Sequence, residues 1–532
     1  MRRFSRLFAT LLLCFACLPV QARDTYPRAV ALDALHYRLQ LTLTANSDEV
    51  RGETAILFQF NEGGVKEITL DFAGLTVDGV TEEQRAAQFT HAGDKLKIAL
   101  AGNYQRGDRC TLAVKYHGRP SDGLIIRKNK YGDHVFFADN WPNRAHYWFP
   151  AIDHPYDKAT AEFIVTAPAD YDVIANGRLL EKTSLQNGRE LTHWREETPI
   201  PTYCMVIGAA QFAIINAGNV QRDGADVPVS YYLYPKDRDR GVNGYGRVAQ
   251  IVEFFSNLVG PYPYEKLALV QSSTRYGGME NASNIFLAEN AFNEHLNAHE
   301  IAHQWFGDSV TEADWHHLWL SEGFATYFAH LFAERFAGRD RFVQLMLADK
   351  TSYLREYEKD PRPIYDPAIT DLLKLLNANN YQKGGWVLHM LRGVLGDEKF
   401  FAGIRDYYRS YRDRNALTED LQRVMEFHAG QQLGWFFKQW IYEPGYPIYD
   451  VTWRWDEGAK ELKLSVKQTQ PQTVFRMPVE IEFKLEKSAR RELLQVNART
   501  QEFSYKLAAK PLSVVFDPDE WVLKVASLAE SK

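Results

Sequence analysis

Two histidines and a glutamate within five residues are the part of the sequence whose types and spacing point to chemistry. His299, Glu300 and His303 form a His-Glu-x-x-His pattern, inside a stretch whose periodicity predicts a helix over residues 289–306. Residues four apart lie one above the other on a helix face, so both imidazoles can reach one metal ion at about 2.0–2.1 Å. Glu300 would then project beside the ion as a base for water. Taken alone, the pattern also fits a solvated helix face.

A third metal ligand is expected from the next predicted helix. Glu322 follows His303 after 18 intervening residues. A polar connection over residues 308–314 and a second helix over 318–336 can return antiparallel and bring Glu322 to the metal. His-His-Glu with a fourth position left to water is typical of catalytic zinc, whereas structural zinc more often has four protein ligands that include cysteines. We therefore expect one zinc ion per chain on His299, His303 and Glu322, where cobalt or manganese could substitute.

The remaining histidines of this region have no ligand spacing. His295 and His330 lie on predicted helices, and His316 and His317 are adjacent in the connection. Isolated or adjacent histidines are more often solvated or packed than bound to metal. We expect such roles for all four.

A glycine turn upstream of the first helix carries another carboxylate. It consists of Gly277, Gly278, Met279, Glu280 and Asn281, and by local chemistry alone it is a loop with an exposed Glu. Together with residues 299–307 and 318–325, however, it resembles the aminopeptidase N family of zinc metallopeptidases, which includes the leukotriene-hydrolysing enzyme. The resemblance covers nearly the whole chain after its first residues, including residues 144–155 and 440–447.

The resemblance implies an enzyme that removes the N-terminal residue from peptides with a free N-terminus. Glu280 would bind the α-amino group, and the turn formed by Gly277, Gly278, Met279 and Asn281 would line the substrate's first residues. A carboxylate at a fixed distance from the metal pairs with an ammonium group and so selects the end of a peptide.

A second amine contact is implied at Asp139, where the family has Glu or Gln five residues before the Arg that matches Arg144. The shorter Asp side chain is expected to make a longer or water-bridged contact. Tyr381, followed by Lys383 and Gly384, matches the family's tyrosine that stabilises the oxyanion, although alone it would be a packing residue. Glu300 would act as the general base.

Two other functions fit parts of the pattern. A thermolysin-type zinc endopeptidase shares the His-Glu-His-Glu chemistry but has no need for Glu280 and Asp139. A non-catalytic binding protein of the same fold usually shows eroded ligands, and here the three ligands, the base and the tyrosine are all present. An epoxide-hydrolase side activity follows from family analogy only.

The chain is expected to form several domains, because 532 residues exceed what one hydrophobic core supports. These domains must position the residues named above. Alternation of apolar and polar residues predicts an N-terminal antiparallel β domain over residues 23–216. Helical periodicity predicts a mainly helical domain over 217–447, which the resemblance implies is a thermolysin-like zinc catalytic domain. Alternation returns in a C-terminal β-sandwich over 448–532. The fold class is multidomain α+β. Many larger relatives continue into a helical domain, so a short three-domain form is expected.

Residues 1–22 are predicted to form an export signal. A basic start precedes an apolar stretch over residues 7–20, and a small-residue cleavage site ends at Ala22. The apolar stretch is shorter than a membrane-spanning helix, so no stable membrane anchor is predicted. We expect a periplasmic or secreted protein.

Charge and cysteine content set further limits. Removal of the three arginines of the signal changes the formal charge from −6 to −9, which argues against nucleic-acid binding. Cys110 and Cys204 are the two cysteines beyond the signal, and a disulfide or two buried thiols are both open. Composition sets neither the oligomeric state nor the preferred N-terminal residue.

Overall fold

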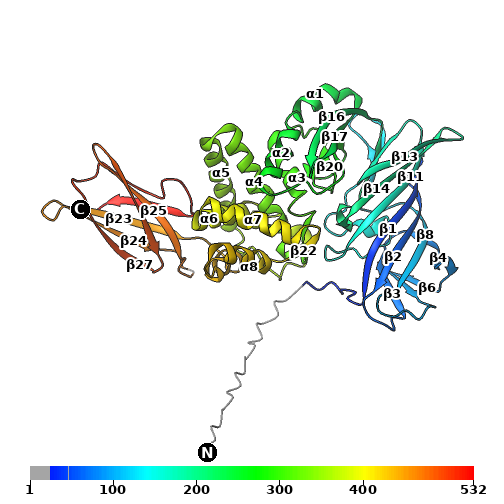
Figure 1. Cartoon of the computed structure of the whole chain (residues 1–532), viewed down its shortest axis with the longest axis horizontal. Helices are drawn as coiled ribbons and strands as arrows, with labels where there is room; N and C mark the ends of the chain where they lie inside the picture. The colour runs from blue at the N-terminus through cyan, green and yellow to red at the C-terminus, as the bar shows by residue number, and fades with distance from the viewer. Residues whose placement is uncertain (1–23, 46, 472, 532) are drawn as a thin grey trace, which may run out of the picture.

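The computed structural model describes residues 24–45, 47–471 and 473–531. The export signal predicted over residues 1–22 lies outside the described residues. Figure 1 shows an elongated molecule with a β domain at one end, a helical domain in the middle and a second β domain at the other end. The predicted multidomain α+β fold class is confirmed.

The N-terminal domain is built on a sheet of eight strands. Its core follows the alternation of the sequence, since Tyr37, Leu39 and Leu41 are buried while their neighbours are more exposed. Pairing is antiparallel except that β1 and β11 run parallel. In sheet order the strands are β13 (Arg178–Leu185), β14 (Arg189–Pro201), β11 (Lys158–Pro168), β1 (Leu32–Thr42), β2 (Val50–Phe60), β8 (Arg109–Gly118), β4 (Thr76–Glu82) and β5 (Arg85–Ala86).

Two smaller sheets complete this domain. One contains β12 (Asp172–Ala175), β15 (Ile207–Ala210), β10 (His134–Ala138) and β9 (Leu124–Lys128). The other contains β3 (Glu67–Asp71), β7 (Lys95–Ala99) and β6 (Phe89–Ala92).

The middle domain contains a five-stranded sheet that the periodicity did not reveal. In sheet order its strands are β16 (Ala213–Arg222), β17 (Ala225–Leu233), β18 (Leu267–Ser272), β20 (Asn284–Ala288) and β19 (Gly278–Met279). Strand β18 is buried at every position, as parallel strands covered on both faces are, so it shows no alternation. The expected boundary between residues 216 and 217 falls inside β16, which pairs with β17 of this sheet.

Helices pack beside this sheet and form most of the middle domain (Figure 1). They are α1 (Arg238–Gly244), α2 (Val248–Leu258), α3 (Glu294–His303), α4 (Trp319–Ala337), α5 (Arg339–Tyr357), α6 (Gly384–Leu395), α7 (Asp397–Tyr411), α8 (Thr418–Ala429) and α9 (Gly434–Phe437). Helix α3 begins later than predicted, because the Asn293 side chain accepts hydrogen bonds from the His295 and Leu296 amides and caps it. Two short strands, β21 (Val310–Glu312) and β22 (Arg414–Ala416), pair in parallel.

The C-terminal domain consists of two sheets. One contains β27 (Thr500–Lys506), β24 (Glu461–Gln468), β23 (Ile448–Asp456) and β29 (Val525–Glu530), and the other contains β26 (Ala489–Val496), β25 (Met477–Lys484) and β28 (Ser513–Phe516). Strand β29 returns to pair in parallel with β23.

Cys110 and Cys204 are free, buried thiols, which resolves the alternative that the sequence left open. The Cys204 thiol donates to Asp308 Oδ1 at 3.3 Å. Among the described residues, no helix has the length and apolar character needed to cross a membrane.

Candidate active site

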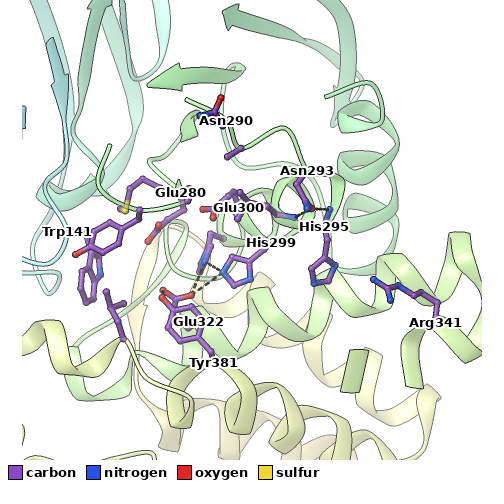
Figure 2. Close-up of a pocket in the computed structure, with 18 residues that line it drawn as sticks. Trp141, Glu280, Asn290, Asn293, His295, His299, Glu300, Glu322, Arg341 and Tyr381 are labelled. Carbon is purple, nitrogen blue, oxygen red and sulfur yellow. Dashed lines mark hydrogen bonds and ion pairs between the residues drawn. The ribbon is translucent and has the colours of Figure 1, made fainter. Parts of the chain in front are cut away.

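Helices α3 and α4 bring the three predicted metal ligands together. The Nε2 atoms of His299 and His303 lie 3.1 Å apart. Glu322 Oε2 lies 3.2 Å from the first and 3.3 Å from the second. Figure 2 shows the His299 and Glu322 side chains directed toward each other.

This arrangement fits a zinc ion. Ligand atoms about 2.0–2.1 Å from a tetrahedral ion are separated by about 3.3–3.4 Å, close to the separations seen here. Two imidazoles and one carboxylate are the donor types of catalytic zinc. Burial opposes the ionisation of Glu322, but the neighbouring His303 and His299 outweigh it and lower its pKa. The carboxylate is therefore in the charged form that a metal requires.

Outer contacts orient these ligands. His303 Nδ1 lies 3.2 Å from the Phe306 carbonyl oxygen and 2.9 Å from Ser321 Oγ. A proton on Nδ1 that is donated to the carbonyl leaves Nε2 as the lone-pair donor. Tyr381 donates to Glu322 Oε1 at 2.6 Å, so Oε2 is left for the metal.

Glu300 reaches the same space because a glycine lies beside it. A Cβ atom on Gly278 would stand 2.3 Å from Glu300 Oε1, so a side chain at that position would displace the carboxylate. Glu300 is 4% exposed, and burial raises its pKa well above the ordinary value. The charge of a bound divalent ion would favour the carboxylate form. Oxygen atoms of Glu300 and Glu280 lie within 4.8 Å of each other and of a His303 nitrogen.

Gln304, directly after the last residue of α3, holds the glycine turn in place. Its Nε2 donates to the Glu280 carbonyl at 2.5 Å, and its Oε1 accepts from the Ser283 amide at 2.8 Å. Burial raises the pKa of Glu280, while His303 opposes that shift. The Glu280 carboxylate is therefore buried beside the metal ligands at the end of an edge strand.

Tyr381 lies close to the metal ligands because the backbones of α4 and α6 touch at two glycines. It lies in a single π-helical turn, Asn379–Lys383, just before α6. A Cβ on Gly323 of α4 would stand 2.9 Å from Gly384 Cα, so only glycines permit this contact. The Tyr381 ring stacks on the His299 ring with centroids 6.0 Å apart. Its hydroxyl therefore reaches the metal ligands from the α6 side.

A cavity of about 720 Å³ contains these groups. Its wall includes the three ligands, Glu300, Tyr381, Gly277, Gly278, Met279 and Glu280. Asp139 and Asn281, which the resemblance also placed at the substrate, are not on this wall.

The Asp139 carboxylate is paired with a cation in this structure. Its side chain is fully buried, with Oδ1 accepting from Arg144 Nη2 at 2.5 Å and Oδ2 from the Arg275 amide at 3.3 Å. The short Asp side chain is thus paired with Arg144. Asn281 is also fully buried, and its amide has no hydrogen-bond partner among the described residues.

Two side chains on the cavity wall were missed by the sequence reasoning. His295 packs against the His330 ring with centroids 5.1 Å apart and also lines the cavity, as does Arg341 of α5. The position of His295, one helical turn before His299, was a usable signal. Arg341 had none, because the fold alone brings α5 to this site.

Comparison with known proteins assigns the N-terminal and middle domains of the chain to one family. Residues 33–204 match the Peptidase M1 N-terminal domain and residues 245–440 match the Peptidase family M1 domain. Tricorn protease-interacting factor F2 of Thermoplasma acidophilum is 28% identical over 87% of this chain and 62% of its own length. Probable aminopeptidase 2 of Sulfurisphaera tokodaii is 26% identical over 78% of this chain and 55% of its own length. The chain thus spans about half to three-fifths of these relatives.

Solved structures agree with this assignment. An M1 zinc metallopeptidase from Deinococcus radiodurans is 27% identical, with a TM-score of 0.68 over 77% of this chain and 93% of its own. A mutant of that protein, 26% identical, was solved with a Tyr-Ser-Ala substrate. Aminopeptidase A of Legionella pneumophila, at 18% identity and a TM-score of 0.82 over 95% of this chain and 61% of its own, shares the fold. With both family domains matched and the zinc ligands assembled, this chain belongs to peptidase family M1, the aminopeptidase N family of zinc metallopeptidases.

Proposed function

We propose that this protein is a zinc-dependent aminopeptidase that hydrolyses the N-terminal peptide bond of peptides with a free α-amino group. The observation that carries the proposal is the position of Glu280, whose carboxylate lies within 4.8 Å of Glu300 and His303 in the cavity. A substrate ammonium paired with Glu280 would place the first peptide bond beside the metal ligands. The relative solved with Tyr-Ser-Ala supports a peptide as the substrate.

The residues have separate tasks in this reaction. A zinc ion on His299, His303 and Glu322 would supply Lewis-acid polarisation of the scissile carbonyl and acidify water. Glu300 accepts a proton from the attacking water, whose oxygen forms the new bond to the carbonyl carbon. Glu300 then gives this proton to the amide nitrogen as the C–N bond breaks, which releases a free amine. Tyr381 donates a hydrogen bond to the oxygen of the tetrahedral carbon.

The test uses two forms of one substrate. An aminoacyl-anilide should be cleaved, its N-acetylated form should not, and removal of the metal with a chelator should abolish turnover. Rates are measured by anilide release over a panel of amino acids, with elemental analysis of the purified protein. Equal cleavage of the acetylated substrate would exclude an exopeptidase, and internal cleavage of an end-blocked peptide would favour the thermolysin-type alternative.

Glu280→Gln should lower kcat/KM for aminoacyl-anilides by about 10- to 150-fold, the value of one hydrogen bond to a charged group. The amide keeps the size of the side chain but lacks the charge that pairs with ammonium. Steady-state kinetics would measure this loss. Glu294→Gln, on the exposed first turn of α3, is a matched control that should stay close to wild type. If both variants behave alike, Glu280 does not bind the amine.

Export from the cytoplasm is the second part of the proposed function. Its support is the basic start, the apolar stretch and the small-residue site ending at Ala22 in residues 1–22. The mature enzyme then acts in the periplasm or outside the cell, on peptides that reach that compartment.

A further inference from the structure

The cavity carries opposite charges on its two sides. Figure 2 shows Glu280 and Arg341 on opposite sides of the cluster of His299, Glu322 and Tyr381. Arg341 is the single Arg or Lys among the described residues that line the cavity. A short peptide is itself bipolar, with an ammonium at one end and a carboxylate at the other.

Arg341 is available for a ligand. Its side chain is exposed, and Figure 2 shows it directed toward His295. In the described part of the chain it forms no ion pair, and the nearby carboxylate of Glu294 is engaged by Arg247 at 3.2 Å. Burial lowers the pKa of His295 to about 3, so the imidazole beside Arg341 is neutral at neutral pH. The positive charge at this end therefore belongs to Arg341.

Arg341 also marks the far end of the cavity. It lines both this cavity and a neighbouring one of about 430 Å³, whose wall includes Phe332 and Phe336. A substrate anchored at Glu280 that extends past the metal ligands along the cavity would approach Arg341. A cavity of about 720 Å³ lies in the size range that encloses a drug-sized ligand, comparable to a peptide of a few residues.

We infer that Arg341 binds the free C-terminal carboxylate of short peptide substrates and so makes this enzyme favour peptides of a few residues. This inference rests on the proposed aminopeptidase function. The guanidinium matches a carboxylate with two parallel N–H···O bonds, which a neutral amide end cannot accept in the same way. Arg341 is thus a specificity residue that acts at the end of the substrate opposite to Glu280.

The experiment compares three substrates with the same N-terminal residue, chosen from the anilide panel. They are a tripeptide ending in Gly-Gly, its C-terminal amide, and the anilide, which has no carboxylate. The wild type should cleave the acid with a kcat/KM about 5- to 30-fold above that of the amide. This factor lies between the free-energy contribution of an exposed ion pair and that of a well-formed hydrogen bond to a charged group. Arg341→Gln should remove this preference and leave anilide cleavage unchanged, while Arg341→Lys should keep part of it.

Arg355→Gln is the matched control, because Arg355 is exposed on the same helix α5 and lies outside the cavity wall. It should retain the wild-type preference for the acid. Equal cleavage of acid and amide by the wild type would overturn the inference, and so would an Arg341→Gln variant that loses activity equally on all three substrates. Failure to cleave any anilide would instead contradict the aminopeptidase function.

Discussion

Glu300→Gln should lower kcat by about 10²- to 10⁴-fold, or about 2.7–5.5 kcal/mol of transition-state stabilisation, while the protein keeps its zinc. Glutamine has nearly the same shape but cannot accept the proton of the attacking water. The three converging ligand atoms belong to His299, His303 and Glu322. Glu300 supplies none of them, so its substitution should leave the zinc bound. The measurements are kcat with the best anilide and zinc per chain by elemental analysis.

The same variant separates chemistry from folding. Glutamine would fill the same buried space beside Gly278, so this substitution should leave the unfolding midpoint nearly unchanged. Glu294→Gln at the other end of α3 again serves as the control. Near wild-type kcat in Glu300→Gln would remove Glu300 from the mechanism, and loss of zinc together with activity would make it a structural residue of the metal site.

The metal centre could be predicted because its spacing is local. His299 and His303 are one helical turn apart, so the helix alone aligns them. Glu322 needed one further step, the return of a second helix to the first, and α4 packs against α3. Glu280 and Tyr381 came from the resemblance alone, and no local pattern would have brought them to the metal.

Other parts depend on contacts between distant segments. Strand β18 has no alternation because neighbours cover both of its faces, so a buried strand was not recognised within a helical region. The resemblance placed Asp139 at the substrate, and the pairing of its carboxylate with Arg144 could not be read from the sequence. Arg341 is brought to the site only by the packing of α5 beside α4. Such long-range placement is decided by tertiary packing, which periodicity and motif spacing do not report.

Tyr381→Phe should lower kcat by about 10²- to 10³-fold with little change in KM, because its hydroxyl stabilises charge that develops only in the transition state. In the free enzyme this hydroxyl donates to Glu322 Oε1 at 2.6 Å. It thus lies beside the metal ligands, where the reacting carbonyl would be bound. Phenylalanine keeps the ring that stacks on His299, so the loss should be confined to the hydrogen bond. Steady-state kinetics with the best anilide would separate kcat from KM.

Tyr408→Phe is the control for Tyr381, since Tyr408 is a buried tyrosine of α7 whose hydroxyl donates to the Pro261 carbonyl at 2.9 Å. Loss of that bond should cost about 1 kcal/mol of stability and leave kcat unchanged. A kcat within about threefold of wild type in Tyr381→Phe would rule out an oxyanion role, because one such donor is worth 10²-fold or more. Zinc loss in parallel with kcat would show that the hydroxyl serves Glu322 as a metal ligand instead. A fall in kcat at full zinc occupancy is the result that a direct role for Tyr381 requires.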